Sequence, residues 1–223
     1  QMYLAIIYTY GKGVNKDYSK VFYWYQKAAE LGDSIAQLNL GIMYHYGKGI
    51  EEDYSESVFW YQKAAEQGQA EAQTSLAWMY ENGKGIGINN EQAVYWYKKA
   101  AERGNTNAQL KLGIIYKNGS DTGEDYTQSF YWYKKVAEQG DAVAQLNVGI
   151  MYEYGKGVGE DYSQAAFWYK KAAEQGHSEA QANLGWFYLN GKGVQLDNKK
   201  AVDWYKKAAE QGYTSAQLSL GEI

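Results

Sequence analysis

Two histidines and a recurring aspartate are the side chains of this sequence that could carry acid–base or metal chemistry. His45 and His177 occupy different positions of a repeated pattern, so they indicate neither a metal site nor a catalytic triad. The aspartate recurs where helices are predicted to begin, but Asn89 takes its place once. Asparagine caps a helix as well as aspartate does and is no acid, so the series predicts capping. We therefore expect no enzyme activity and no cofactor. The aspartates are Asp17, Asp53, Asp125, Asp161 and Asp197.

One pattern of 36 residues repeats along the whole chain. A fixed period of this size is typical of solenoid proteins, in which one repeat cannot bury its apolar face alone and stacks on its neighbours. The composition, 45% hydrophobic with no cysteine, allows a continuous core and excludes disulfides and thiolate sites. We predict that all six periodic tryptophans lie in the core. They are Trp24, Trp60, Trp96, Trp132, Trp168 and Trp204.

Each repeat is predicted to hold two helices. In residues 35–70, the spacing of Ala36, Leu40 and Tyr44 places them on one side of a first helix, here called helix A, which Gly47 ends. Asp53 caps a second helix, helix B, which runs to Gly68. Without a single proline, this predicts an all-α, right-handed α/α solenoid of about six 36-residue helix-turn-helix repeats.

We expect a single solenoid over residues 1–223 that begins and ends inside a helix, as if cut from a longer array. The reason is that Gln1 occupies the position held later by Gln37, Gln73 and Gln109. The loop from Gly119 to Gly123 has lost the lysine of the other loops and is expected to be looser. End-to-end self-association of the chain is left open.

The charge pattern excludes two classes of partner. The net charge is −4, and charges of both signs alternate, so there is no basic stripe for nucleic acid. No apolar run approaches the roughly 20 residues that span a bilayer, so membrane insertion is not expected. A lysine recurs once per repeat, as in Lys48 and Lys84, and is interpreted as a solvated ridge.

The repeat resembles the SEL-1-like repeat, a branch of the tetratricopeptide superfamily. The resemblance is carried by Leu40-Gly41, the paired glycines Gly47 and Gly49, and the segment from Trp60 to Gly68, and it covers nearly the whole chain. It implies a scaffold for protein complexes, often bacterial and then periplasmic or secreted. A cysteine-rich subgroup acts on β-lactams, but its disulfides have no counterpart here.

Superposed on tetratricopeptide packing, three columns of helix A residues line a concave groove, a column being one position of the repeat read along the chain. The first column is apolar, the second varies, and the third can hydrogen-bond along a bound backbone. The first holds Ile42, Trp78, Ile114, Ile150 and Trp186; the second His45, Glu81, Lys117 and Glu153; the third Tyr46, Asn82, Asn118, Tyr154 and Asn190.

Two interpretations of the apolar column remain. The isoleucines could simply pack helix A against its neighbours, whereas Trp78 and Trp186 would overfill an isoleucine-sized space and so favour an exposed anchor for a partner. The leading hypothesis is a non-catalytic scaffold that binds a protein or peptide segment in the groove. The alternative is a module that binds glycans or cell-wall fragments by stacking sugar rings on the aromatic side chains.

Overall fold

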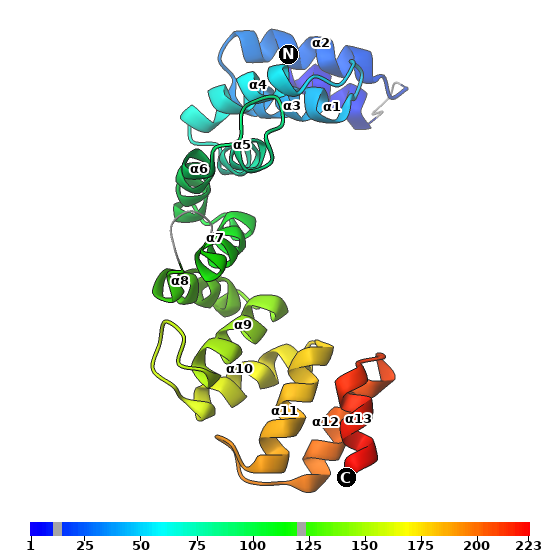
Figure 1. The fold of residues 1–223 in the computed structure, drawn as a ribbon. Helices are drawn as coiled ribbons and strands as arrows, with labels where there is room; N and C mark the ends of the chain where they lie inside the picture. The colour runs from blue at the N-terminus through cyan, green and yellow to red at the C-terminus, as the bar shows by residue number, and fades with distance from the viewer. Residues whose placement is uncertain (11–14, 120–123) are drawn as a thin grey trace. The chain divides into compact units, whose positions relative to one another are not determined.

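The computed structural model describes residues 1–10, 15–119 and 124–223, which form helices and connecting turns with no strand among them (Figure 1). The all-α prediction is confirmed. Lys12 and most of the loop expected to be looser, Ser120 to Gly123, lie outside the described residues. The helices are α1 (Met2–Tyr10), α2 (Tyr18–Glu30), α3 (Ser34–Tyr46), α4 (Tyr54–Glu66), α5 (Ala70–Asn82), α6 (Asn90–Glu102), α7 (Thr106–Asn118), α8 (Tyr126–Glu138), α9 (Ala142–Glu153), α10 (Tyr162–Glu174), α11 (Ser178–Asn190), α12 (Asn198–Glu210) and α13 (Thr214–Glu222).

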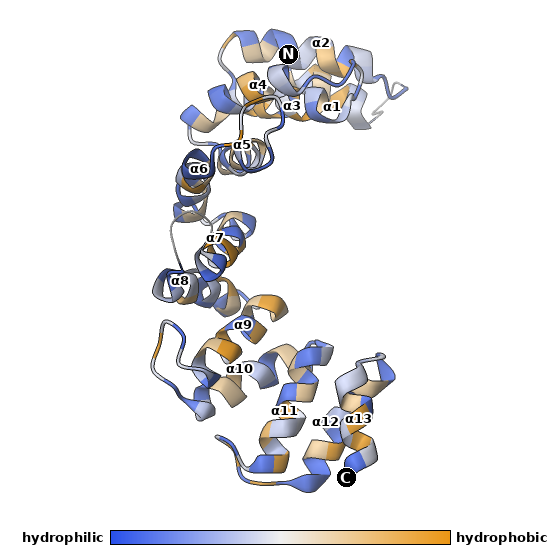
Figure 2. Cartoon of the chain, in the orientation of Figure 1, coloured by the Kyte–Doolittle hydropathy of each residue, from blue (hydrophilic) through white to orange (hydrophobic). Residues whose placement is uncertain are grey.

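The chain divides into two compact units, residues Gln1–Gln109 and Leu110–Ile223, and each is described by itself. Odd-numbered helices are helix A of a repeat and even-numbered helices are helix B. Successive helices pack against one another from α1 to α6 in the first unit and from α8 to α13 in the second. Figure 2 shows hydrophobic and hydrophilic residues mixed along these helices, as expected of elements with one buried face.

The caps predicted from the sequence set the helix ends. Oδ1 of Asp53 accepts hydrogen bonds from the backbone N–H groups of Ser55 and Glu56, at 2.9 and 3.0 Å. Asp161 accepts in the same way from Gln164 N–H at 2.9 Å. At the end of α3, Gly47 adopts φ +63°, a left-handed conformation that glycine takes without a steric penalty. The aspartate series therefore caps helices.

In the loops that contain Gly49, Gly85, Gly157 and Gly193, this second glycine allows successive repeats to touch. A side chain on Gly193 would collide with the backbone carbonyl of Tyr162, the first residue of α10 in the preceding repeat. Lys192 of the same loop places its ammonium 4.5 Å from the centre of the Tyr162 ring, a cation–π contact. Lys84 on Tyr54 and Lys156 on Tyr126 repeat this contact at 5.0 and 4.7 Å. The lysine ridge thus also packs on tyrosine rings.

A tyrosine of helix B is the central core residue of each repeat. Tyr169 is fully buried, and a Cβ added to Gly149 of α9 would lie 2.6 Å from its Cδ1. The glycine therefore lets helix A approach the ring. The prediction that all six periodic tryptophans are core was right only in part: Trp132 and Trp168 are 6% exposed, whereas the other four are half-buried at the edge of the core.

Candidate functional site

In the first unit, the predicted groove residues cluster around His45. Its ring lies 4.5 Å from the ring of Tyr46, 5.5 Å from that of Tyr54 and 5.3 Å from that of Trp78. Ile42 and Trp78 are half-buried and pack against the core cluster that contains Leu76 and Met79. In this unit each side chain of the apolar column therefore contacts the core on one side and solvent on the other.

Burial lowers the pKa of His45, and the charge of Lys84 acts in the same direction, while Glu52 opposes them. Nδ1 of His45 is buried and has no hydrogen-bond partner among the described residues. The neutral imidazole is therefore favoured, as part of an aromatic cluster.

In the second unit, the apolar column is more open. Ile114 and Trp186 are 45% and 42% exposed, and Ile150 is half-buried against the core cluster that contains Tyr169. Trp186 also contacts the ring of Phe187, with the ring centres 5.7 Å apart. The tryptophan that replaces isoleucine at position 186 therefore presents a large part of its surface to solvent.

Several side chains of the second and third columns form hydrogen bonds to other groups of the same chain. Glu81 accepts a hydrogen bond from the Tyr97 hydroxyl at 2.7 Å, and Lys117 donates to Oδ1 of Asn147 at 3.0 Å. Asn82 and Asn190 donate to backbone carbonyls of their own helices, those of Trp78 and Trp186, at 2.9 Å. Tyr46 and Tyr154 are each 63% exposed, and Asn118 is exposed.

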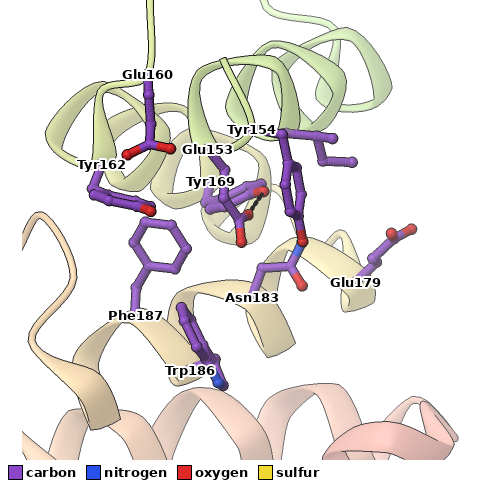
Figure 3. Close-up of a pocket in the computed structure, with 10 residues that line it drawn as sticks. Glu153, Tyr154, Glu160, Tyr162, Tyr169, Glu179, Asn183, Trp186 and Phe187 are labelled. Carbon is purple, nitrogen blue, oxygen red and sulfur yellow. Dashed lines mark hydrogen bonds between the residues drawn. The ribbon is translucent and has the colours of Figure 1, made fainter. Parts of the chain in front are cut away.

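A pocket of about 570 Å³ lies in the second unit between α9, α10 and α11 (Figure 3). The pocket is lined by members of all three predicted columns and by further residues that were not predicted from the sequence. Figure 3 shows Glu153 between Tyr162 on one side and Tyr154 on the other. The lining consists of Ile150, Glu153, Tyr154, Glu160, Tyr162, Tyr169, Glu179, Asn183, Trp186 and Phe187.

The carboxylates give this pocket a negative field. The Tyr169 hydroxyl donates a hydrogen bond to Oε2 of Glu153. Burial raises the pKa of Tyr169, and this contact with Glu153 raises it further. Glu153 is also the largest cause of the raised pKa of Tyr154, and Glu160 adds to the effect of burial in raising the pKa of Tyr162. Each shift has the direction expected when a nearby negative charge disfavours a phenolate.

A second, smaller pocket of about 250 Å³ adjoins the first, since both are lined by Ile150 and Tyr154. Lys117 and Lys156 supply its charges, so the two neighbouring pockets are of opposite sign. Lys156 also lies 3.4 Å from the hydroxyl of Tyr126, another lining residue. The surface of this unit therefore carries an acidic and a basic pocket side by side.

The sequence reasoning missed six of the lining residues: Glu160, Tyr162, Tyr169, Glu179, Asn183 and Phe187. They come from the loop before α10, from α10 itself and from α11 in the next repeat, so no single column contains them. Asn183, three positions before Trp186, could have been found by extending the helical face by one turn.

Within residues 1–10, 15–119 and 124–223, no group of three or more His, Asp or Glu side chains could hold a metal ion. Over the same ranges, no helix has the length and hydropathy needed to cross a bilayer.

Paired helices repeating every 36 residues define an all-α helical repeat solenoid. The Sel1 repeat matches the chain six times, at residues 1–33, 34–69, 70–105, 106–141, 142–177 and 178–213, so the chain belongs to the Sel1 repeat family. The SEL-1-like resemblance noted in the sequence is confirmed. Proteins of this family generally mediate protein–protein interactions and are generally non-catalytic.

Two solved bacterial structures resemble the chain closely. One is a protective antigen present in uropathogenic Escherichia coli strains that displays an SLR fold, with 40% sequence identity and a TM-score of 0.93 over 99% of this chain. The other is a Sel1 repeat protein from Oxalobacter formigenes, with 38% identity and a TM-score of 0.76, also over 99%. The chain spans 47% and 64% of their respective lengths. No curated protein gives a significant match.

Proposed function

We propose that this chain is an interaction scaffold that binds an extended segment of a partner protein on its helix A surface. The observation that carries the proposal is the pocket of about 570 Å³ in the second unit, bordered by the exposed rings of Trp186 and Tyr154. Its volume is in the range of pockets that hold small molecules or cofactors. Tryptophan and tyrosine are the residues that most often anchor a protein interface.

The position of the pocket between successive repeats supports an extended ligand. Its lining comes from α9 and α11, which are helix A of two neighbouring repeats, and from α10 between them. The adjoining pocket continues to Lys117 of α7. A segment that crosses these helices would meet a new set of side chains at each repeat, which suits the recognition of a sequence.

A selection from a random peptide library displayed on phage tests this function. Trp186→Ile is the matched variant, because isoleucine occupies the same column at Ile114 and Ile150 and should be accepted by the fold. We expect peptides that are enriched by the parent chain and bind the variant about tenfold more weakly, a loss of about 1.4 kcal/mol. Enriched peptides should shift backbone amide resonances of α9 and α11. Peptides that bind both chains equally, or shift only helix B residues, would overturn the groove assignment.

The glycan alternative has support of its own in the same pocket, because rings and carboxylates also line many sugar sites. Calorimetric titration with peptidoglycan fragments and simple oligosaccharides separates the two ligands. Under our proposal these sugars give no saturable heat. Saturable sugar binding that Trp186→Ile abolishes would instead favour the glycan function.

A further inference from the structure

The larger pocket of the second unit has carboxylates on three different elements. Glu153 ends α9, Glu160 lies in the loop before α10, and Glu179 is in the first turn of α11. Figure 3 shows Glu160 and Glu179 at opposite ends of the pocket, with Glu153 between them. No lysine or arginine is among its lining residues. A ligand group in this pocket would therefore face negative charge from several directions.

Aromatic rings form the rest of the wall. Tyr154, Tyr162 and Trp186 are the most accessible of these rings, since Tyr169 and Phe187 are buried. Lys192 already occupies one face of the Tyr162 ring, with its ammonium 4.5 Å from the ring centre, so Tyr154 and Trp186 are the accessible rings left for a ligand. Rings and carboxylates together favour a planar cation, which can stack on an aromatic face while its N–H groups donate to oxygen atoms.

We propose that this pocket binds an arginine side chain of the partner segment. The inference rests on the proposed function and states which chemistry the segment must carry. The guanidinium donates forked hydrogen bonds to carboxylates and is more weakly hydrated than an ammonium, so it loses less on leaving water. Lysine is accepted less well, because its compact charge cannot stack on the rings in the same way.

The adjoining basic pocket limits what can lie beside that arginine. Lys117 and Lys156 would repel a second basic side chain and attract an acidic one. Both lysines contact uncharged groups, the Asn147 amide and the Tyr126 phenol. The segment that fits is therefore one of mixed charge, with an arginine near an acidic residue, and not a polybasic tail.

A titration followed by nuclear magnetic resonance tests the arginine. The probes are the peptide acetyl-Gly-Ser-Arg-Ser-Gly-amide and the same peptide with citrulline, which has the shape of arginine without its charge. We expect the arginine peptide to shift the indole N–H resonance of Trp186 and to bind about tenfold more tightly than the citrulline peptide. Acetyl-Gly-Arg-Ser-Arg-Gly-amide should bind more weakly than at least one of the two mixed-charge peptides, acetyl-Gly-Arg-Ser-Glu-Gly-amide and acetyl-Gly-Glu-Ser-Arg-Gly-amide.

The variant Glu160→Gln/Glu179→Gln removes two of the three carboxylates and should weaken the arginine peptide about tenfold. Glu174→Gln is the control for a lost charge, because Glu174 is exposed on α10 and pairs with Lys170 at 3.7 Å, away from the pocket lining. Equal binding of arginine and citrulline peptides, no shift of Trp186, or equal loss in the control would overturn the inference.

These outcomes are distinct from a failure of the scaffold function. If the library selection returns peptides without basic residues that still depend on Trp186, the groove binds peptides and only the arginine assignment is wrong. If the selected peptides ignore Trp186, the proposed function itself fails.

Discussion

The side-chain amide of Gln175 donates a hydrogen bond of 2.8 Å to Oε1 of Gln145, thirty residues earlier in the same repeat. Gln145 is 3% exposed and uses its own N–H₂ group to bind the carbonyl of Ala137 at 3.1 Å. One buried glutamine thus joins the helices on either side of it. The same arrangement recurs where Gln67 donates to Gln37 at 2.7 Å and where Gln211 donates to Gln181 at 2.8 Å.

Replacing Gln145 by alanine is expected to lower the free energy of unfolding by about 1–3 kcal/mol, because it removes the hydrogen bonds that this buried side chain makes to the carbonyl of Ala137 and to Gln175. Gln175→Ala, at an exposed residue, should cost less. Urea unfolding followed by circular dichroism measures both. If the two variants and their combination are simply additive, the hydrogen bond between the glutamines contributes nothing.

A methyl group on Gly149 should destabilise the second unit. Gly149→Ala places a Cβ 2.6 Å from Cδ1 of the buried Tyr169 ring, so the ring or α9 must move, at a cost of about 1–3 kcal/mol. Gly159→Ala is the matched control, since nothing lies within 4 Å of its added Cβ. The melting temperature should fall for the first variant and stay nearly constant for the second. Equal melting temperatures would mean that the ring adapts freely.

Acidification should weaken the first unit through His45. Burial keeps the pKa of His45 below its ordinary value of 6.5, so the unfolded chain binds a proton more readily than the folded protein does. The stabilising contribution of neutral His45 is therefore fully present above about pH 6.5 and is lost as the pH falls below that value. The denaturant midpoint measured between pH 7.5 and 5.5 should fall less in His45→Phe than in the parent.

His177→Gln is the control for this measurement, because glutamine stands at the equivalent helix start at Gln69. The pH dependence should be reduced more by His45→Phe than by this variant. If His45→Phe keeps the pH dependence of the parent, the acid sensitivity has another origin.

Trp78 and Trp186 should differ in their contribution to stability. Trp78 is half-buried and packs on the core of the first unit, so Trp78→Ala should cost about 2–3 kcal/mol. Trp186 is 42% exposed, so Trp186→Ala should cost about half as much. Thermal unfolding of the two single variants measures the difference. The reverse order would mean that Trp186 has a structural role that its exposure does not reveal.

The fold was predictable because its signals are local and recur in each repeat. Asp53 and its equivalents mark helix starts, Gly47 marks a helix end, and the period sets the pairing of helices. For the buried glutamines, the sequence showed only that a glutamine recurs at the same position of the repeat. Nothing in the type of residue at Gln145 indicates that its amide faces a backbone carbonyl, since glutamine is mostly exposed in proteins.

The pocket was predictable only in part. Reading columns along helix A found Ile150, Glu153, Tyr154 and Trp186, which do lie together. It could not find Glu160, because that residue lies in a loop whose path depends on contacts with the repeat before it. The same reasoning also could not show that the side-chain amide of Asn190 donates a hydrogen bond to the carbonyl of Trp186.

Contacts such as Gly193 on Tyr162 and the hydrogen bond from Gln145 to the carbonyl of Ala137 join one repeat to the next. Under tension along the chain, such bonds are loaded one after another and not all at once. Pulling on the ends would then release the chain in steps. A repeat of 36 residues, such as 142–177, frees about 120 Å of extended chain when it opens. The solenoid can therefore lengthen under load while its remaining repeats stay folded.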